Sequence, residues 1–127
     1  MIVVDASAAL SALLNAGPAR AALADEQLHV PHLVDHEVAS GLRRQVTAEQ
    51  LGPDAGWAAL DTWRRLGMTR YPVFGLLDRV WQLRDNFTAY DASYVALAER
   101  LGCALLTADR RLGRAPGVGC PITLVPR

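Results

Sequence analysis

One stretch of the sequence decides the fold: Thr88-Ala-Tyr-Asp91-Ala-Ser-Tyr-Val-Ala-Leu-Ala-Glu-Arg-Leu101-Gly102-Cys103-Ala-Leu-Leu-Thr107-Ala-Asp109. Thr88 is a residue type that caps helix N-termini and Gly102 is the type that ends helices, so a helix is predicted through Leu101. Cys103 to Thr107 is a short apolar run, which is typical of a buried strand. A helix that leads directly into a buried strand is the unit from which α/β proteins are built.

The same alternation of strand and helix precedes this stretch. Short apolar runs predict strands, and apolar residues at helical spacing predict helices. On this basis we expect strands over 1–5 and 28–30, and helices over 7–14, 19–24 and 33–45. The first strand, Ile-Val-Val, ends at Asp5.

The middle of the chain is predicted to form a helical hairpin. Thr47-Ala-Glu-Gln50 has the form of a capping box, and a further helix with apolar residues at helical spacing runs to Gly67. A strand is expected over 68–71, and Pro72 suits the first turn of the next helix. A short helix opened by Asp109 and an edge strand over 122–125 complete the pattern.

These elements predict one α/β domain over residues 1–127, a three-layer α/β/α sandwich with a mainly parallel central sheet. No linker, repeat or low-complexity stretch divides the chain. In such sheets ligands bind at the carboxyl ends of the strands, so acids directly after strands are the residues to examine.

Composition and charge narrow the function classes. No apolar run approaches the roughly 18 residues of a membrane helix and Asp5 interrupts the apolar start, so we expect a cytoplasmic protein without membrane association. Cys103 and Cys120 lack the spacing of a metal site or a disulfide scaffold. The net charge is zero, but four acids gathered in one site would leave thirteen positive against nine negative charges elsewhere. All basic residues are arginine, whose planar fork suits phosphate, although a GC-rich genome also produces this bias.

Four acids stand where strands and helices could bring them together. Asp5 ends the first strand and Asp109 follows the strand over 103–107, so both fall on the carboxyl edge of the sheet. An Asp in such a place also serves as a helix N-cap, and this alternative stays open for each. Asp91 and Glu37 each belong to an otherwise apolar helix face, although the helix dipole alone could account for an acid in a first turn, as at Asp91.

A cluster of these acids predicts a divalent cation. Carboxylates that converge without counter-charge repel each other and raise each other's pKa values. Mg²⁺ or Mn²⁺ relieves this repulsion through carboxylate and water ligands, whereas zinc more often recruits Cys or His. Such an ion activates water and neutralises charge on a phosphodiester. Ser7 and Thr107, each two residues from a proposed ligand, are candidates to orient the carboxylates, with simple turn chemistry as the alternative.

The motifs occur in a recognisable order: Asp5-Ala-Ser-Ala8, Glu37 on the third helix, Tyr90 to Glu99, and Leu105-Leu-Thr-Ala-Asp-Arg-Arg-Leu112. In this order, from Met1 to Val125, the chain resembles PIN-domain ribonucleases of the VapC toxin type. The stretch from Thr88 to Leu112 is the longest and most specific part of the resemblance.

The resemblance implies Mg²⁺- or Mn²⁺-dependent endonucleolytic cleavage of cellular RNA, such as tRNA or ribosomal RNA, by a water molecule that the metal activates. It implies four catalytic acids, with Asp5, Asp91 and Asp109 holding the metal and Glu37 completing the site or positioning the water. It further implies a type II toxin–antitoxin system, with a homodimeric toxin and a cognate VapB-type antitoxin whose tail covers the active site.

Three arginines are candidate RNA-binding residues. Arg84 could reach toward the carboxylates from a helix end, and Arg110 directly follows the last of the four acids. Arg43, like its neighbour Arg44, lies about two turns, or roughly 10 Å, beyond the acid of the third helix. For each, a solvated surface arginine is the alternative.

Other protein classes fit less well. A phosphotransferase with an Asp after its first strand would have a second Asp where Ser7 stands and a lysine partner, and the chain contains no lysine. A receiver domain lacks support for the same reason, and the P-loop signature is missing. His29, His32 and His36 do not form a zinc-protease motif. The remaining alternative is a non-catalytic PIN-like module that binds RNA or assembles with proteins, against which the four acids argue.

Overall fold

A five-stranded sheet forms the centre of the molecule. The computed structural model describes residues 1–127. The strands are β1 (Ile2–Val4), β2 (Leu28–Pro31), β3 (Met68–Tyr71), β4 (Ala104–Thr107) and β5 (Ile122–Leu124), in the spatial order β3-β2-β1-β4-β5. Every neighbouring pair is parallel, which confirms the predicted α/β class.

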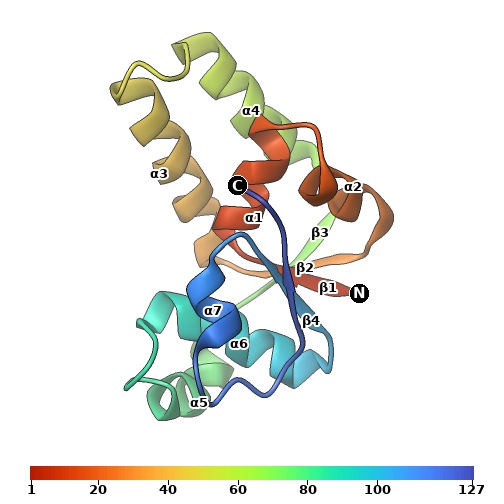
Figure 1. Ribbon diagram of the computed structural model, residues 1–127, viewed down its shortest axis with the longest axis vertical. Helices are drawn as coiled ribbons and strands as arrows, with labels where there is room; N and C mark the ends of the chain where they lie inside the picture. Colours follow the sequence, from red (N-terminus) through yellow and green to blue (C-terminus); the bar gives the residue numbers. More distant parts are fainter.

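Helices cover both faces of the sheet and give the three predicted layers (Figure 1). On one side lie α1 (Ala6–Leu14), α2 (Pro18–Asp25), α3 (Leu33–Thr47) and α4 (Pro53–Arg65). On the other lie the 3₁₀ helix η1 (Phe74–Leu76), α5 (Leu77–Gln82), α6 (Ala89–Leu101) and α7 (Arg110–Arg114). None of these helices combines the length and the apolar character that crossing a membrane requires.

The order of the strands determines where a site can form. The chain adds β2 and β3 on one side of β1 and then returns to form β4 on the other side. The carboxyl ends of β1 and β4 are therefore adjacent at the point where the winding reverses, which is where open α/β sheets bind ligands. Val4 pairs with Leu106, and the next N–H, that of Asp5, donates to the Leu106 carbonyl at 3.1 Å.

The helix α6 is the most deeply buried helix of the fold. Its residues 92–98 are all buried, since the sequence there is apolar or small on every side. The predicted ends are confirmed: the Thr88 hydroxyl accepts a hydrogen bond from the Asp91 N–H at 3.2 Å, and Gly102 adopts the left-handed conformation with φ of 66°. This packing fixes the direction in which the first turn of α6 presents its side chains.

The predicted helical hairpin is present as α3 and α4, but its capping box is wrong. α3 continues through Thr47, and α4 begins at Pro53 with Gly52 as its N-cap residue and no side-chain cap. Val46 accounts for the longer helix, because it extends the apolar face of α3 and packs beside Gly56 of α4. Proline fits the first turn of a helix and so sets the start of α4.

The placement of Pro72 in the first turn of a helix is also wrong. Pro72 follows β3 and precedes η1, and the α-helical part begins only at Leu77. Gly75 lies in what would be the first turn, and glycine disfavours helix by about 1 kcal/mol relative to alanine. The segment therefore forms a 3₁₀ turn and a short α-helix in place of one longer helix.

An ion pair fixes the start of α3 against its neighbours. The guanidinium of Arg70 on β3 donates two hydrogen bonds to Asp35, at 2.7 and 2.9 Å, and the Trp63 indole of α4 donates a third at 2.9 Å. Arg70 holds the pKa of Asp35 below its usual value. Because Glu37 is only two residues further along α3, this network also determines where that acid lies.

Candidate active site

Asp5 lies at the base of the site and is held by three groups. Its side chain is only 4% exposed. One carboxylate oxygen accepts hydrogen bonds from the Ser7 hydroxyl at 2.7 Å and the Ala8 N–H at 2.9 Å, and the other accepts one from the Thr107 hydroxyl. Asp5 is thus the N-cap of α1 and also a carboxylate with a fixed orientation. The capping alternative is therefore confirmed for Asp5, and the same carboxylate also lines the pocket described below.

The two hydroxyls also connect β1 to the loop that carries Asp109. Ser7 accepts a hydrogen bond from the Ala108 N–H at 2.9 Å, and Thr107 accepts one from the Asp109 N–H at 3.0 Å. Each hydroxyl therefore donates its proton to Asp5 and accepts from the backbone next to β4. Ser7 and Thr107 orient one carboxylate and position the segment that presents another.

Asp109 makes an ion pair with its own helix. It caps α7 by accepting from the Arg111 N–H at 2.9 Å, and the Arg111 guanidinium donates to both carboxylate oxygens at 3.1 and 2.7 Å. The Arg111 side chain is 84% exposed, so water screens this pair. Arg111 lowers the pKa of Asp109, which keeps this carboxyl ionised.

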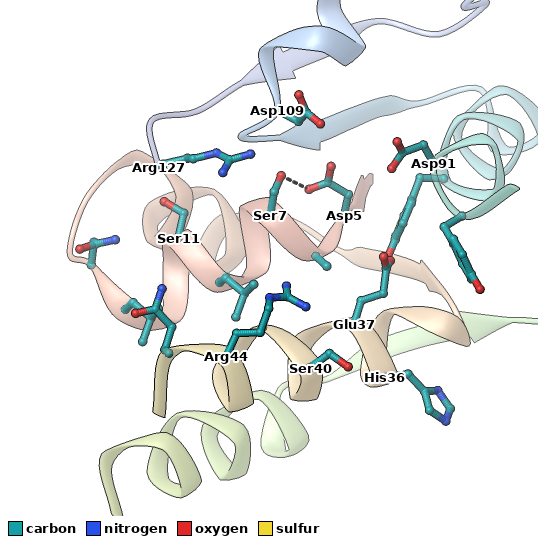
Figure 2. Close-up of a pocket in the computed structure, with 18 of the residues that line it drawn as sticks. Asp5, Ser7, Ser11, His36, Glu37, Ser40, Arg44, Asp91, Asp109 and Arg127 are labelled. Carbon is teal, nitrogen blue, oxygen red and sulfur yellow. Dashed lines mark hydrogen bonds between the residues drawn. The ribbon is translucent and has the colours of Figure 1, made fainter. Parts of the chain in front are cut away.

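Asp91 and Glu37 complete the group from opposite sides of the sheet. Asp91 comes from the first turn of α6, and Glu37 from the second turn of α3. Tyr94, three residues after Asp91, is 1% exposed and donates a hydrogen bond from its hydroxyl to Glu37. Figure 2 shows Asp5, Glu37, Asp91 and Asp109 directed toward one space.

That space is a pocket of about 900 Å³ between α1, α3 and the start of α6. All four predicted acids and Ser7 line it, together with Tyr94. Thr107 is fully buried and does not line the pocket itself, but its hydroxyl contacts Asp5 and the Asp109 N–H, which do. The pocket extends along α1 and α3 away from the acids, as far as Asn15 and Gln50.

Three of the four carboxyls are shifted toward their neutral form. Burial is the largest cause of the raised pKa of Asp5, Glu37 and Asp91. The negative charge of Asp109 raises the pKa of Asp91 further, and that of Asp91 does the same for Glu37 and, as the smallest cause, for Asp5. The acids therefore repel each other across the pocket, and the charges of Arg111 and Arg44 offset this repulsion only in part at Asp91 and Glu37.

The donor chemistry of the pocket fits a hard divalent cation. Its acids offer only oxygen atoms, which Mg²⁺ and Mn²⁺ prefer, and no arginine or histidine lies within 4 Å of the carboxylates of Asp5, Glu37 or Asp91. In the present arrangement, no three His, Cys, Asp or Glu side chains come close enough together to hold a metal ion. The reason is visible in the hydrogen bonds, since Asp5, Glu37 and Asp109 each turn toward a donor of the protein itself.

None of the three predicted RNA-binding arginines lines the acid pocket. Arg84 does not line the pocket; its guanidinium stacks over the Trp81 ring at 4.7 Å and donates to the Trp81 carbonyl at 2.9 Å. Arg43 is exposed and also lies outside the pocket. Arg110 lines a smaller adjoining pocket together with Asp109.

Sequence reasoning missed two residues that line the acid pocket, Tyr94 and Arg127, whereas Arg44, which it had considered beside Arg43, also lines the pocket. Tyr94 and Arg44 had a signal in their spacing. Tyr94 is one turn from Asp91, and Arg44 is seven residues, about 10 Å, beyond Glu37 on the same side of α3. Arg127 had no such signal, because its position depends on how the segment after β5 packs.

A comparison with protein families gives a match over most of the chain. The model of the PIN domain family matches residues 2–118. Ribonuclease VapC9 of Mycobacterium tuberculosis is 65% identical over 127 residues, which is the full length of both chains, and VapC ribonuclease Mb0985 of Mycobacterium bovis matches equally well. Ribonuclease VapC1 of M. tuberculosis is 44% identical, with 97% of this chain and 96% of that one covered.

Solved structures share the fold at much lower identity. VapC20 of M. tuberculosis, described as a Sarcin-Ricin loop cleaving toxin, has a TM-score of 0.61 at 22% identity, with 86% of this chain and 90% of that one covered. VapBC2 of Rickettsia felis, bound to a DNA fragment from its promoter, has a TM-score of 0.66 at 14% identity, with 97% and 99% covered. At these identities the likeness is one of fold.

Proposed function

Because the chain belongs to the PIN-domain family and is an endoribonuclease of the VapC type, the toxin of a toxin–antitoxin pair, we propose that it cleaves RNA in a reaction that depends on Mg²⁺ or Mn²⁺. We assign the reaction to Asp5, Glu37, Asp91 and Asp109. One observation carries this proposal: the four carboxylates line one pocket, and only Asp109 has an arginine within 4 Å. Such a pocket attracts a divalent cation.

In this proposal Asp5, Asp91 and Asp109 hold the metal. When bound, the ion neutralises their repulsion, polarises the scissile phosphodiester and increases the acidity of water. Ser7 and Thr107 keep the Asp5 carboxylate in one orientation, so that it is preorganised for the cation. The ion pair of Asp109 with Arg111 is weak, because the Arg111 side chain is exposed to water. Asp109 would therefore release Arg111 in favour of the cation.

Glu37 is the proposed general base. Tyr94 holds one of its carboxylate oxygens, and the other remains available to orient the attacking water and accept its proton. Burial raises the pKa of Glu37, which makes it a stronger base than an exposed glutamate. In-line attack of that water on phosphorus leaves a 5′-phosphate and a 3′-hydroxyl.

We further propose that residues 1–127 act as one nuclease domain on structured cellular RNA, either tRNA or ribosomal RNA. The description of VapC20 as a Sarcin-Ricin loop cleaving toxin supports this class of target. The bases that this chain recognises depend on residues outside the four acids.

The decisive experiment incubates purified, antitoxin-free protein with total cellular RNA. Parallel reactions contain Mg²⁺, Mn²⁺ or chelator, and the new 5′ ends are mapped. We expect discrete cuts that need metal, carry 5′-phosphate and disappear in Asp91→Asn. Cuts that persist in chelator would contradict the metal requirement, and cuts that persist in Asp91→Asn would remove this acid from the mechanism.

The same experiment tests the alternative of a non-catalytic PIN-like module. A folded, metal-loaded protein that leaves a broad RNA pool intact would favour that alternative. A binding module also has no reason to bind Mn²⁺ through Asp5 and Asp91. Calorimetric titration of wild type and Asp5→Asn with Mn²⁺ therefore separates the two functions without relying on cleavage.

We propose a VapB-type antitoxin and a second copy of the chain as partners. The VapC relationship and the structural likeness to VapBC2 support the antitoxin. For the homodimer, the support is an exposed apolar face on η1 and α5, formed by Phe74, Leu77 and Trp81, which are 84%, 50% and 67% exposed. Light scattering of wild type and the Phe74→Ser, Trp81→Ser double variant tests this face. A dimer that persists in the variant would place the interface elsewhere.

A further inference from the structure

The arginines of this chain divide into two groups. Most either pair with an acid or donate to a backbone carbonyl, as Arg79 does with Glu99 and Arg20 with the end of α1. Five have side chains that make no ion pair and no hydrogen bond: Arg43, Arg44, Arg110, Arg114 and Arg127. An arginine with no internal partner is available to bind an external anion.

Two of these five face the acid pocket. Arg44 and Arg127 line it, and the other three do not. Figure 2 shows the guanidinium of Arg44 extending from α3 toward the pocket and that of Arg127 entering beside Ser7 and Ser11. The two cations therefore approach the carboxylates from different elements.

The backbone that carries Arg127 is tied down. The Val125 N–H donates to the Thr107 carbonyl at 2.8 Å, and the Ser11 hydroxyl of α1 donates to the Pro126 carbonyl at 2.6 Å. Arg44 is placed equally firmly, because it follows the buried Leu42 on the longest helix of the fold. Helix α3 and a hydrogen-bonded segment after β5 thus carry the two side chains to the same pocket.

The two guanidinium groups act on the acids without pairing with them. The charge of Arg44 lowers the pKa of Glu37, and the charge of Arg127 lowers the pKa of Asp109, in each case as the smallest of the causes. Both pairs nevertheless lie beyond 4 Å. The guanidinium groups are near the reacting centre, positively charged and unengaged.

We propose that Arg44 and Arg127 bind two phosphates of the RNA backbone, one on each side of the phosphate that is cleaved. This inference rests on the proposed ribonuclease function. Four acids in one pocket repel an RNA strand, and two cations beside them offset that repulsion where the neighbouring phosphates pass. The planar guanidinium can donate two parallel hydrogen bonds to one phosphate. Both arginines are positioning residues, since neither touches the reacting atoms.

The test measures RNA binding separately from cleavage. The protein carries Asp91→Asn to prevent turnover, and the probe is a fluorescein-labelled, mixed-sequence single-stranded RNA titrated at several salt concentrations. We expect Arg44→Ala and Arg127→Ala each to weaken binding about tenfold and to reduce the slope of log K against log salt by about 1. Arg44→Lys should restore the slope but only part of the affinity, because an ammonium lacks the planar fork.

The chain offers a matched control for each arginine. Arg43→Ala removes the neighbouring unpaired arginine of α3, and Arg114→Ala removes one at the end of α7; neither arginine lines the acid pocket. These variants should bind RNA like the parent. If Arg44→Ala and Arg127→Ala match them in affinity and salt slope, the inference is wrong.

A cleavage assay in the otherwise wild-type protein separates this inference from the proposed function. We expect Arg44→Ala to raise KM about tenfold with little change in kcat, while circular dichroism shows an unchanged fold. Metal-dependent cleavage by wild type, with both arginine variants at wild-type KM, overturns the inference alone. Failure of wild type to cleave any RNA overturns the proposed function. If Arg44→Ala and Arg127→Ala bind the antitoxin more weakly but bind RNA normally, the two arginines contact the antitoxin and not RNA. This result would also overturn the inference.

Discussion

Tyr94 shows how one hydroxyl links two layers of the fold at the level of a single residue. It belongs to the buried α6, yet it donates to Glu37, which comes from the opposite side of the sheet. Burial and the negative charge of Glu37 both raise the pKa of Tyr94, so its hydroxyl stays protonated and always acts as the donor. The orientation of the proposed base therefore depends on a neutral residue.

Tyr94→Phe removes this hydrogen bond while keeping the ring. We expect kcat for RNA cleavage to fall about tenfold, in line with losses at other groups that orient a metal-site residue. The hydrogen bond lowers the pKa of Glu37, so its loss raises that pKa further, and the acidic limb of the pH–rate profile should move to higher pH. Tyr90→Phe is the matched control, because Tyr90 lines the same pocket but is 63% exposed and makes no hydrogen bond. A pH profile that does not move would show that Tyr94 does not act on the base.

The predictability of site residues follows the length of the side chain and the rigidity of its element. Asp5 and Asp109 are short and follow strands, so the sheet topology alone brings them to one edge. Arg84 and Arg44 are long, and the direction of each depends on neighbours distant in sequence. The Arg84 guanidinium stacks on the ring of Trp81 one turn back, whereas Arg44 lines the acid pocket. Sequence spacing could not distinguish these outcomes.

At the level of elements, the approach of α1 and α3 determines the width of the pocket. Gly41 makes this approach possible, because a Cβ atom there would lie 2.3 Å from a methyl carbon of Leu10 on α1. Gly41 is one turn beyond Glu37. Any displacement of α3 at this contact therefore moves the proposed base away from Asp5.

Gly41→Ala should separate the two helices. Overpacking costs about 1–3 kcal/mol, and the better helix propensity of alanine returns about 1 kcal/mol, so we expect a net loss of about 1 kcal/mol in the free energy of unfolding. Cleavage should fall further than this loss of stability explains, because Glu37 moves relative to the other acids. Gly67→Ala is the control, since nothing lies within 4 Å of a Cβ atom there. Urea denaturation and RNA cleavage measure the two effects, and normal activity in Gly41→Ala would show that Leu10 absorbs the contact.

A second element-level contact holds the loop before β5. Glu99 of α6 accepts two hydrogen bonds from Arg79 of α5, at 2.6 and 3.0 Å, and one from the Gly119 N–H at 2.6 Å. Arg79 lowers the pKa of Glu99. A carboxyl with a lowered pKa in the folded state stabilises the fold above its unfolded pKa, and this stability is lost as the pH falls through the folded value.

Glu99→Gln should therefore lower the free energy of unfolding by about 1 kcal/mol at pH 7. The difference from wild type should shrink as the pH falls below about 4, where wild type loses the same charge. Glu49→Gln, at an exposed glutamate without an ion-pair partner, should show neither effect. Denaturant unfolding at pH 7 and below about pH 4 tests this prediction. If the difference in free energy of unfolding between wild type and Glu99→Gln stays constant with pH, the charge of Glu99 contributes nothing.

Elements were most predictable where local signals agreed. Thr88 and Gly102 mark both ends of α6, and apolar runs mark the central strands, so these elements match the sequence prediction within a residue or two. The α3–α4 connection was not predictable in detail, because a plausible capping box competed with tertiary packing. Val46 packs on α4, and this contact extends α3 past the position where local sequence would end it.

At the scale of the whole molecule, the burial of Asp91 in the acid pocket opposes folding in the absence of metal. Burial and repulsion raise the pKa of Asp91, so the folded state disfavours its charge, and wild-type stability falls as the pH rises through that pKa. In chelator at pH 7, Asp91→Asn should therefore be at least as stable as wild type. A variant that is less stable by more than about 1 kcal/mol would show that the Asp91 carboxylate supports the fold.

Mn²⁺ should make wild type more stable than Asp91→Asn. At a concentration about 100 times its Kd, the ion adds about 2.7 kcal/mol to wild type, which corresponds to a rise of about 10 °C in Tm for a domain of this size. Asp91→Asn should gain much less, because one proposed ligand has lost its charge. Differential scanning fluorimetry with and without metal measures both shifts. Equal shifts in the two proteins would place the bound ion away from Asp91.

The strand order also governs when the enzyme becomes active during its own synthesis. Asp5 is translated 102 residues before Thr107, which fixes its orientation. β1 stays without its β4 neighbour until that point, and pairings between distant segments form slowly. The four acids are therefore brought to one sheet edge only after β4 has been made, so the nuclease site cannot form earlier in synthesis than this strand.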